Sequence, residues 1–250
     1  SVIVVDDVRA AGRFLKLTAG ENDWRIVIVD TVDEMNNNAV NALLKMLEEP
    51  PARTLLLLVT HSPGRLPVTI RSRCCGLALG RLTEKVISEL LSRFAPELTG
   101  DDATALARLS EGSIGRALEL AESEGLALYQ VLLKLMETLP SIDVEALHSL
   151  ADRLAVRDAD NAYRTATTLL TWWIARMIGA GARNAPLSGG EVVPGEQSCA
   201  ERLLGLARVE QWMEVWEKVT RLIAQADSIN LDRKQVVLSA FHTMERAARA

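Results

Sequence analysis

Three consecutive residues, Ser72-Arg73-Cys74, are the part of the chain best suited to chemistry. They follow an apolar run over residues 55–59 and a short loop. A guanidinium stays charged and forks onto two phosphate oxygens, which makes arginine the residue suited to contacting phosphate. An arginine at the far end of a domain, placed outside the core, is predicted to contact a phosphate held by a neighbouring protein. The alternative is a surface arginine in a polar loop, and Arg71 is interpreted as a solvated or DNA-facing charge.

A second candidate site follows the apolar run Ile26-Val27-Ile28-Val29, which ends in Asp30. A carboxylate at the end of a buried strand could help to hold Mg²⁺, although a buried strand that ends in an Asp turn is common. Hydrolysis of a nucleotide also needs a residue that orients the attacking water. The next residue is Thr31, which cannot act as a carboxylate base, and we expect Asp33 and Glu34 to point elsewhere.

The sequence contains no G-x-x-x-x-G-K-[ST] loop, the motif whose backbone N–H groups hold nucleotide phosphates. The chain begins at Ser1, inside a strand-like run and without an initiator Met. We therefore expect further sequence upstream, and such a loop could lie there.

The elements that must position these residues alternate between strands and helices up to about residue 80. Residues 2–5 are continuously apolar, and 25–29 and 54–60 each contain an apolar run, which predicts strands covered on both faces of a parallel sheet. Asp6 or Asp7 can cap a first helix, and a second is predicted to begin at residues 36–38 and to end at Pro50. This order predicts an α/β layer.

Beyond residue 80 the pattern is helical. Thr83, Thr99 or Asp101, and Ser113 are possible caps of three short helices. From residue 126 apolar residues recur at helical spacing, and 201–226 and 232–249 are predicted as the two last helices. Residues 179–195 contain five Gly and two Pro and are predicted as a mobile loop. The tryptophans of this part are expected to pack in the core or at a subunit interface: Trp172, Trp173, Trp212 and Trp216.

Composition limits the choice of partners. The net charge of the 250-residue chain is −5, and residues 1–76 carry nine acids and nine bases, so no overall basic field would hold nucleic acid. The three cysteines, Cys74, Cys75 and Cys199, form no spaced pairs, so we predict a cytoplasmic protein without a zinc site. No run of about 18 apolar residues predicts a membrane span.

Two blocks make the chain resemble the clamp-loader branch of the AAA+ family. They are residues 41–51 (NALLKMLEEPP) and 66–74 (LPVTIRSRC), on either side of the third predicted strand. The resemblance is strong over 1–125 and architectural over 126–250. It implies part of an AAA+ α/β domain with a parallel sheet over residues 1–79, an all-α lid of three helices over 80–125, and an all-α collar for oligomerisation over 126–250.

By this resemblance Arg73 is an arginine finger that acts in trans on the Mg-ATP of an adjacent subunit, with Ser72 and Cys74 shaping its loop. No cofactor is expected to be bound tightly in cis, and no metal. Asp30 and Thr31 would form a degenerate Walker B site.

The sensor positions would be occupied by Thr60 and His61 and, in the lid, by Gly115 and Arg116. Active members of the family carry an arginine at the place of Gly115. Arg116 lies about 100° further around the helix, so the resemblance implies a second loss of catalytic competence. Thr60 and His61 could equally be strand-end residues without a ligand, and Arg116 a solvated or ion-paired residue.

The resemblance implies a subunit of the bacterial DNA polymerase III clamp loader that does not hydrolyse ATP itself. Its partners would be delta and three gamma/tau copies in a pentamer, the sliding clamp, and primed DNA indirectly, with no membrane. Two other functions stay open, namely an active ATPase of the gamma/tau kind and a DNA-binding adaptor with no role at phosphate. Lys45, Glu48 and Glu49 form a polar helix face that is either solvated or in contact with a neighbouring subunit or DNA.

Overall fold

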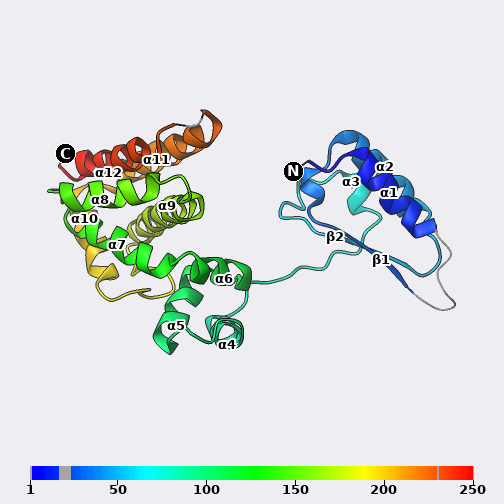
Figure 1. Ribbon diagram of the computed structural model, residues 1–250, viewed down its shortest axis with the longest axis horizontal. Helices are drawn as coiled ribbons and strands as arrows, with labels where there is room; N and C mark the ends of the chain where they lie inside the picture. Colours follow the sequence, from blue (N-terminus) through cyan, green and yellow to red (C-terminus); the bar gives the residue numbers. More distant parts are fainter. Residues whose placement is uncertain (1, 17–23, 230, 250) are drawn as a thin grey trace. The chain divides into compact units, whose positions relative to one another are not determined.

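The structure is a computed structural model that describes residues 2–16, 24–229 and 231–249. The chain folds into two compact units, residues 1–79 and 80–250. The first is an α/β unit and the second is entirely helical in its described residues, which confirms the predicted fold class (Figure 1). The regions predicted as lid and collar both lie within the second unit, and their separate roles stay predictions.

The α/β unit is built around two parallel strands, β1 and β2, paired in register from Arg25 with Thr54 to Val29 with Leu58. Helices α1 and α2 lie on one side of these strands (Figure 1). The elements of the unit are α1 (Val5–Lys16), β1 (Arg25–Val29), the 3₁₀ helix η1 (Val32–Glu34), α2 (Asn37–Glu48), β2 (Thr54–Leu58) and α3 (Val68–Arg71).

The predicted first strand over residues 2–5 is wrong in extent. Ile3 forms a single parallel bridge with Met35, and α1 already begins at Val5. The carboxylate of Asp7 accepts a hydrogen bond from the backbone nitrogen of Val4 at 3.0 Å. This local contact favours the helical turn over further extended residues, because it satisfies one of the free N–H groups at the helix start.

The prediction that both faces of the sheet are covered is also wrong for the described residues. Exposure alternates along each strand, so that one face packs on the helices and the other is open. Ile26 and Ile28 are 51% and 65% exposed, and the open face also includes Leu55 and Leu57. The apolar runs therefore supply one half-buried face toward the helices and one exposed aliphatic face.

A small core holds the helices to the covered face. It consists of Val8, Val32, Ala39, Leu43 and Ile70. As predicted, α2 begins near Asn36, whose side-chain oxygen accepts from the backbone nitrogen of Ala39 at 2.9 Å. This cap and the buried Ala39 and Leu43 fix the direction of α2, and with it the position of its last residue, Glu48.

The second unit is a set of helices around one continuous core, and α9 packs against α7, α8, α10 and α11. The predicted caps Thr83, Thr99 and Ser113 are confirmed, each accepting a hydrogen bond from a backbone nitrogen of the first turn. The helices are α4 (Glu84–Phe94), α5 (Gly100–Leu109), α6 (Ile114–Glu122), α7 (Gly125–Glu137), α8 (Val144–Ala155), α9 (Asp160–Arg183), α10 (Glu196–Leu206), α11 (Val209–Ile229) and α12 (Arg233–Ala248).

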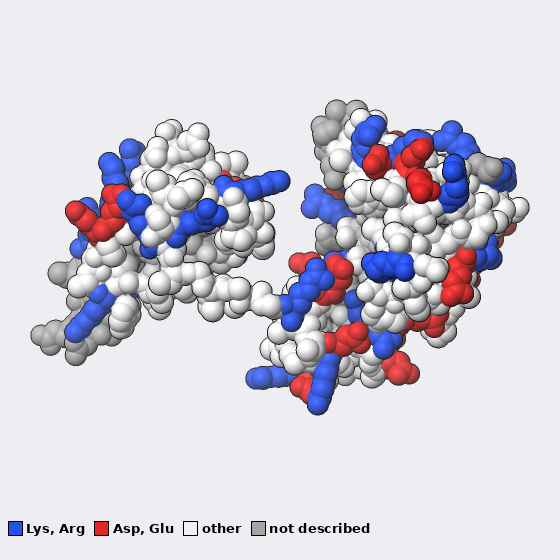
Figure 2. Space-filling model, turned by 180° about the vertical axis from the view of Figure 1, so that it is seen from behind, with Lys and Arg blue, Asp and Glu red and all other residues white. Residues whose placement is uncertain are grey.

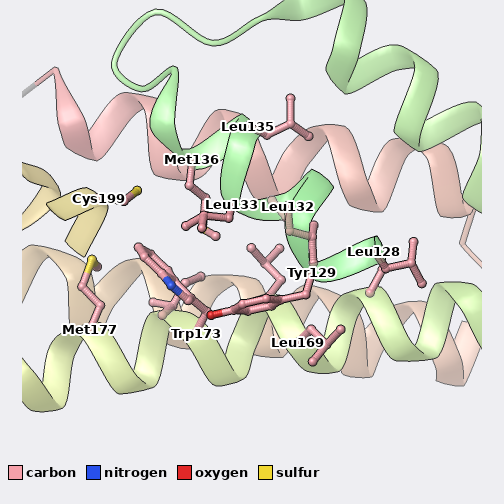
Figure 3. Packing of buried hydrophobic residues seen from close by; sticks show 14 of the residues in the cluster. Leu128, Tyr129, Leu132, Leu133, Leu135, Met136, Leu169, Trp173, Met177 and Cys199 are labelled. Atoms are coloured by element: carbon pink, nitrogen blue, oxygen red, sulfur yellow. The ribbon is translucent and has the colours of Figure 1, made fainter. Parts of the chain in front are cut away.

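Figure 3 shows the centre of this core, where leucines of α7 and the aromatic side chains of Tyr129 and Trp173 lie together with Met177 and Cys199. Trp173 and Trp212 are fully buried, which confirms their predicted packing role. Trp216 is only partly covered and donates from Nε1 to the carbonyl oxygen of Thr171 at 3.2 Å.

Two predictions at the end of the chain are wrong. The helix predicted over 201–226 is two helices, α10 and α11, that meet at Ala207 and Arg208. The loop predicted over 179–195 begins later, because α9 continues to Arg183, and several of the loop residues are buried, among them Leu187, Val192 and Val193.

A buried carboxylate holds this loop in place. Glu196 is fully buried and accepts hydrogen bonds from the Tyr129 hydroxyl, from Arg176 Nη1 and from the backbone nitrogen of Val192. Arg176 also donates to the carbonyl oxygens of Ser188 and Gly190. Burial raises the pKa of the Tyr129 phenol, and the neighbouring carboxylate raises it further. The charge of Glu196 is thus paired and hydrogen-bonded, as a buried charge must be.

Candidate functional site

The short helix α3 brings the candidate arginine to the surface of the α/β unit. Ile70 is buried in the small core and anchors the helix, which ends at Arg71. Ser72 caps it, and the backbone nitrogen of Arg73 donates to the carbonyl oxygen of Ile70 at 3.0 Å. The backbone of the Ser72-Arg73 segment is therefore fixed while its side chains face solvent.

The Arg73 side chain is 36% exposed and leans against the end of α2. Its Nη1 donates to the carbonyl oxygen of Thr69 at 2.9 Å and lies 3.4 Å from the Ser72 hydroxyl oxygen. Its Nη2 lies 2.9 Å from Oε1 of Glu48, with which it forms an ion pair. Within the described part of the chain Nε donates no hydrogen bond, so part of this guanidinium is open to an incoming oxygen.

Ser72 and Cys74, the predicted neighbours of Arg73 in this loop, both lie at the surface. The Ser72 hydroxyl donates to the carbonyl oxygen of Thr69 at 3.2 Å, so Ser72 and Arg73 share that acceptor. Partial burial raises the pKa of the Cys74 thiol, and the neighbouring Cys75 raises it further. An elevated pKa keeps the thiol protonated at neutral pH, which does not suit a nucleophile.

The predicted Walker B residues follow β1 directly. Asp30 is exposed and Thr31 half-buried. The backbone ladder continues past them, since the nitrogen of Val32 donates to the carbonyl oxygen of Val59 at 2.9 Å. The strand end is therefore held close to the end of β2, where Thr60 and His61 lie.

Thr60 and His61 contact a residue that sequence reasoning missed. The Thr60 hydroxyl donates to Asp33 Oδ1 at 2.9 Å, and the backbone nitrogen of His61 donates to Asp33 Oδ2 at 2.7 Å. The expectation that Asp33 points away from the site is therefore wrong. The hydrogen bond from His61 lowers the pKa of Asp33 against a smaller opposing effect of burial, and Thr60 lowers it as well. An acid one turn after a strand end was the only sequence signal for this contact.

The predicted sensor residues of the lid lie in the helical unit. Gly115 is exposed in the first turn of α6, and a side chain there would meet only the Ser113 hydroxyl, at 4.0 Å from its Cβ. Arg116 forms an ion pair with Glu111 at 3.1 Å. Its Nη2 is buried and has no hydrogen-bond partner among the described residues. Arg116 is thus ion-paired within its own unit.

The surface charge is mixed. Figure 2 shows basic and acidic side chains interspersed over the helical unit, whereas much of the visible face of the smaller unit is neutral. In the described ranges no three His, Cys, Asp or Glu side chains are grouped as a metal site would require. Among the described helices, none is long and apolar enough to cross a bilayer.

Comparison with known proteins places the α/β unit in a family. A family model described as "DNA polymerase III, delta subunit" matches residues 1–83. The delta-prime subunit of Pseudomonas aeruginosa is 40% identical over 111 residues, which is 44% of this chain and 34% of that protein. The delta-prime subunit of Escherichia coli is 39% identical over 120 residues, covering 48% and 36% of the two chains. The tau subunit of Escherichia coli is 34% identical over 122 residues, covering 47% and 19%.

Among solved structures, a gamma subunit-related protein of DNA polymerase III from Thermotoga maritima is 20% identical, with a TM-score of 0.48, and the match covers 99% of this chain and 81% of that one.

The first part of the chain, which contains the parallel α/β unit and the surface arginine after α3, is similar in sequence to clamp-loader subunits of DNA polymerase III. Delta-prime and gamma/tau subunits both match it, in each case through less than half of the chain. The aligned part spans about a third of the delta-prime relatives and less of the tau relative.

Proposed function

We propose that this chain acts as a delta-prime subunit of the DNA polymerase III clamp loader, and that Arg73 contacts the ATP of a neighbouring subunit. The observation that carries the proposal is the position of Arg73, on a fixed backbone with a partly open guanidinium. An arginine supplied in trans stabilises charge on the transferred phosphoryl group and is worth about 10³–10⁵ in rate in other systems.

Three features support a subunit that does not hydrolyse ATP itself. Thr31 stands where an active site would need a carboxylate, and Thr60 is engaged by Asp33. Gly115 stands where active members carry an arginine. Delta-prime and gamma/tau relatives match at similar identity, 35–40% against 30–37%, so the proposal rests on these residues and not on identity.

The proposed partners are the delta and gamma/tau subunits and the sliding clamp. The helical unit would hold the assembly together by helix packing, and primed DNA would be contacted mainly by other subunits, because residues 1–76 have no net charge. In this arrangement the chain contributes one group to a neighbour's reaction and otherwise acts as a rigid member of the DNA polymerase III holoenzyme.

The proposal is tested by Arg73→Ala in the clamp loader reconstituted with cognate subunits. We expect ATP hydrolysis at one site to fall by at least about 10³-fold, since an arginine finger contributes about that much. Arg71→Ala is the matched control, because Arg71 is exposed two residues away and forms no ion pair with a described residue. Equal hydrolysis by the two variants at every site would contradict the proposal and favour a DNA-binding adaptor.

A second candidate is an active ATPase of the gamma/tau kind, and the 34% identity over 122 residues to the tau subunit favours it. It predicts that the isolated full-length protein binds Mg-ATP tightly and turns it over. The delta-prime proposal predicts no turnover by the isolated protein, so a hydrolysis assay without partners separates the two.

A further inference from the structure

The C-terminal end of α2 carries an acidic side chain, although a basic side chain would stabilise a helix at this end. Glu48 is the last residue of α2, and Glu49 follows it as the C-cap. The carbonyl groups at a helix C-terminus carry partial negative charge, so an acid in the last turn is unfavourable for the helix. Glu48 is half exposed, and no other ion pair links it to the described residues besides that with Arg73. Its placement is therefore explained by Arg73 better than by α2.

The contacts of Arg73 define the orientation of its guanidinium. Nη1 is held by the carbonyl oxygen of Thr69 at 2.9 Å, and Nη2 lies 2.9 Å from the Glu48 carboxylate. Thr69 is in α3 and Glu48 in α2, so two separate elements fix one planar group. A long, flexible arginine side chain loses much rotamer freedom when it is ordered, and contacts that order it beforehand reduce this cost at the moment of phosphate contact.

We propose that Glu48 is a positioning residue for Arg73. It holds the guanidinium in one orientation at the surface of the α/β unit, with an open edge toward the phosphate of a neighbouring subunit. This inference rests on the proposed function, because it concerns the same arginine. Glu48 itself touches no substrate in this proposal, and its effect on the reaction passes entirely through Arg73.

The test compares Glu48→Gln with Glu49→Gln in the reconstituted clamp loader. Both remove one negative charge from the same helix end, but Glu49 forms no ion pair with a described residue. We expect Glu48→Gln to slow single-turnover hydrolysis at one site by on the order of tenfold, because misplacing a reacting group by about 1 Å can cost about 10²-fold. The ATP concentration for half-saturation should change little, and Glu49→Gln should match the wild type.

A double-mutant cycle shows whether the effect passes through Arg73. In the Arg73→Ala background, Glu48→Gln should have no additional effect, since the group that it positions is gone. Glu48→Asp keeps the charge on a shorter side chain and should recover part of the rate. The melting temperatures of both Glu48 variants should stay near that of the wild type, because exposed ion pairs contribute little to stability.

The two proposals fail in different ways. If Arg73→Ala leaves hydrolysis unchanged, the proposed function is wrong and the role of Glu48 is wrong with it. If Arg73→Ala slows one site while Glu48→Gln behaves like Glu49→Gln, the function stands and the positioning role is overturned. Additive effects of Glu48→Gln and Arg73→Ala would also overturn it, because Glu48 would then act independently of Arg73.

Discussion

Two charged side chains of the α/β unit make contacts of different kinds. Asp33 accepts hydrogen bonds at both carboxylate oxygens, from Thr60 and from the backbone of His61. Arg73 has an ion pair on one nitrogen and hydrogen bonds on another, with Nε still available within the described residues. Asp33 therefore stabilises the fold of its unit, whereas Arg73 keeps the capacity to bind an external anion.

The pKa of Asp33 gives a prediction on pH. Because the folded-state pKa lies below the ordinary value of 3.8, the ionised carboxylate stabilises the fold above that pH and loses this contribution as the pH falls through the lowered pKa. We expect Asp33→Asn to lower the urea denaturation midpoint of residues 1–79 at pH 7. Near pH 3 the same substitution should lower this midpoint by less. Urea denaturation of both proteins at the two pH values measures this.

Asp30→Asn is the control for this prediction, because Asp30 is exposed after the same strand and has no hydrogen-bond partner in the described ranges. It should leave the midpoint unchanged at both pH values. A midpoint for Asp33→Asn that equals that of Asp30→Asn at pH 7 would show that the contacts of Asp33 do not stabilise the unit.

The cysteines should differ in reactivity toward alkylating agents. Burial raises the pKa of Cys199 to about 11, and its side chain lies inside the helical core, whereas Cys74 and Cys75 are exposed. Since the thiolate is the reactive form, iodoacetamide at pH 8 should modify Cys74 or Cys75 in the native protein and Cys199 only after unfolding. Mass spectrometry of labelled peptides measures this, and rapid native labelling of Cys199 would contradict the burial.

At the scale of elements, the sequence predicts features that depend on neighbouring residues, such as helix caps. It does not predict features that depend on contacts between distant residues. Helix starts at Asn36, Thr83, Thr99 and Ser113 were predictable, because a cap depends on a side chain and a backbone group three residues apart. The sequence does not predict the boundary between α10 and α11, because the two residues that separate them, Ala207 and Arg208, are neither Gly nor Pro. There the side chain of Gln211 accepts from the backbone nitrogen of Arg208 at 2.9 Å, which starts a new helix.

In the candidate site, too, the sequence predicts the residues themselves but not their contacts. The loop residues Ser72, Arg73 and Cys74 were identifiable from their types and order along the chain. Their partners were not, since Arg73 meets Glu48 from α2, and Thr60 meets Asp33 across 27 residues. The sequence predicts the polar helix face that includes Glu48, but only the packing of α2 against α3 shows which of its residues contacts Arg73.

The same substitution, glycine to alanine, should change the unfolding free energy in opposite directions at two positions in neighbouring helices. A Cβ at Gly181 in α9 would lie 2.7 Å from Leu204 Cδ2 and 2.9 Å from Val209 Cγ2, whereas one at Gly205 in α10 would meet nothing within 4 Å. We expect Gly181→Ala to lower the unfolding free energy by about 1–3 kcal/mol through overpacking. Gly205→Ala should raise it by about 0.5–1 kcal/mol, because alanine loses less backbone entropy in a helix.

Chemical denaturation of the three proteins, followed by circular dichroism, tests this pair. The two variants serve as controls for each other, because they add the same methyl group to neighbouring helices. If Gly181→Ala were as stable as Gly205→Ala, α9 and α10 would not approach as closely as the structure indicates.

At the scale of the whole molecule, the two units differ in how much apolar surface they bury. The small core of the α/β unit includes Leu43 and Ile70, and the open sheet face is only partly buried. The core of the helical unit runs continuously from Ile87 in α4 to Ala248 in α12. Because the hydrophobic contribution is proportional to the apolar area removed from water, the helical unit should be the more stable of the two.

Native-state hydrogen exchange in increasing denaturant should therefore show two opening free energies, the lower one for β1, β2 and α2 and the higher one for α7 and α9. Leu43→Ala removes a fully buried side chain and should lower the first value by about 2–5 kcal/mol while leaving the second unchanged. Leu169→Ala, also buried, should do the reverse. A single opening free energy shared by all these elements, shifted equally by both substitutions, would show that the two units unfold as one.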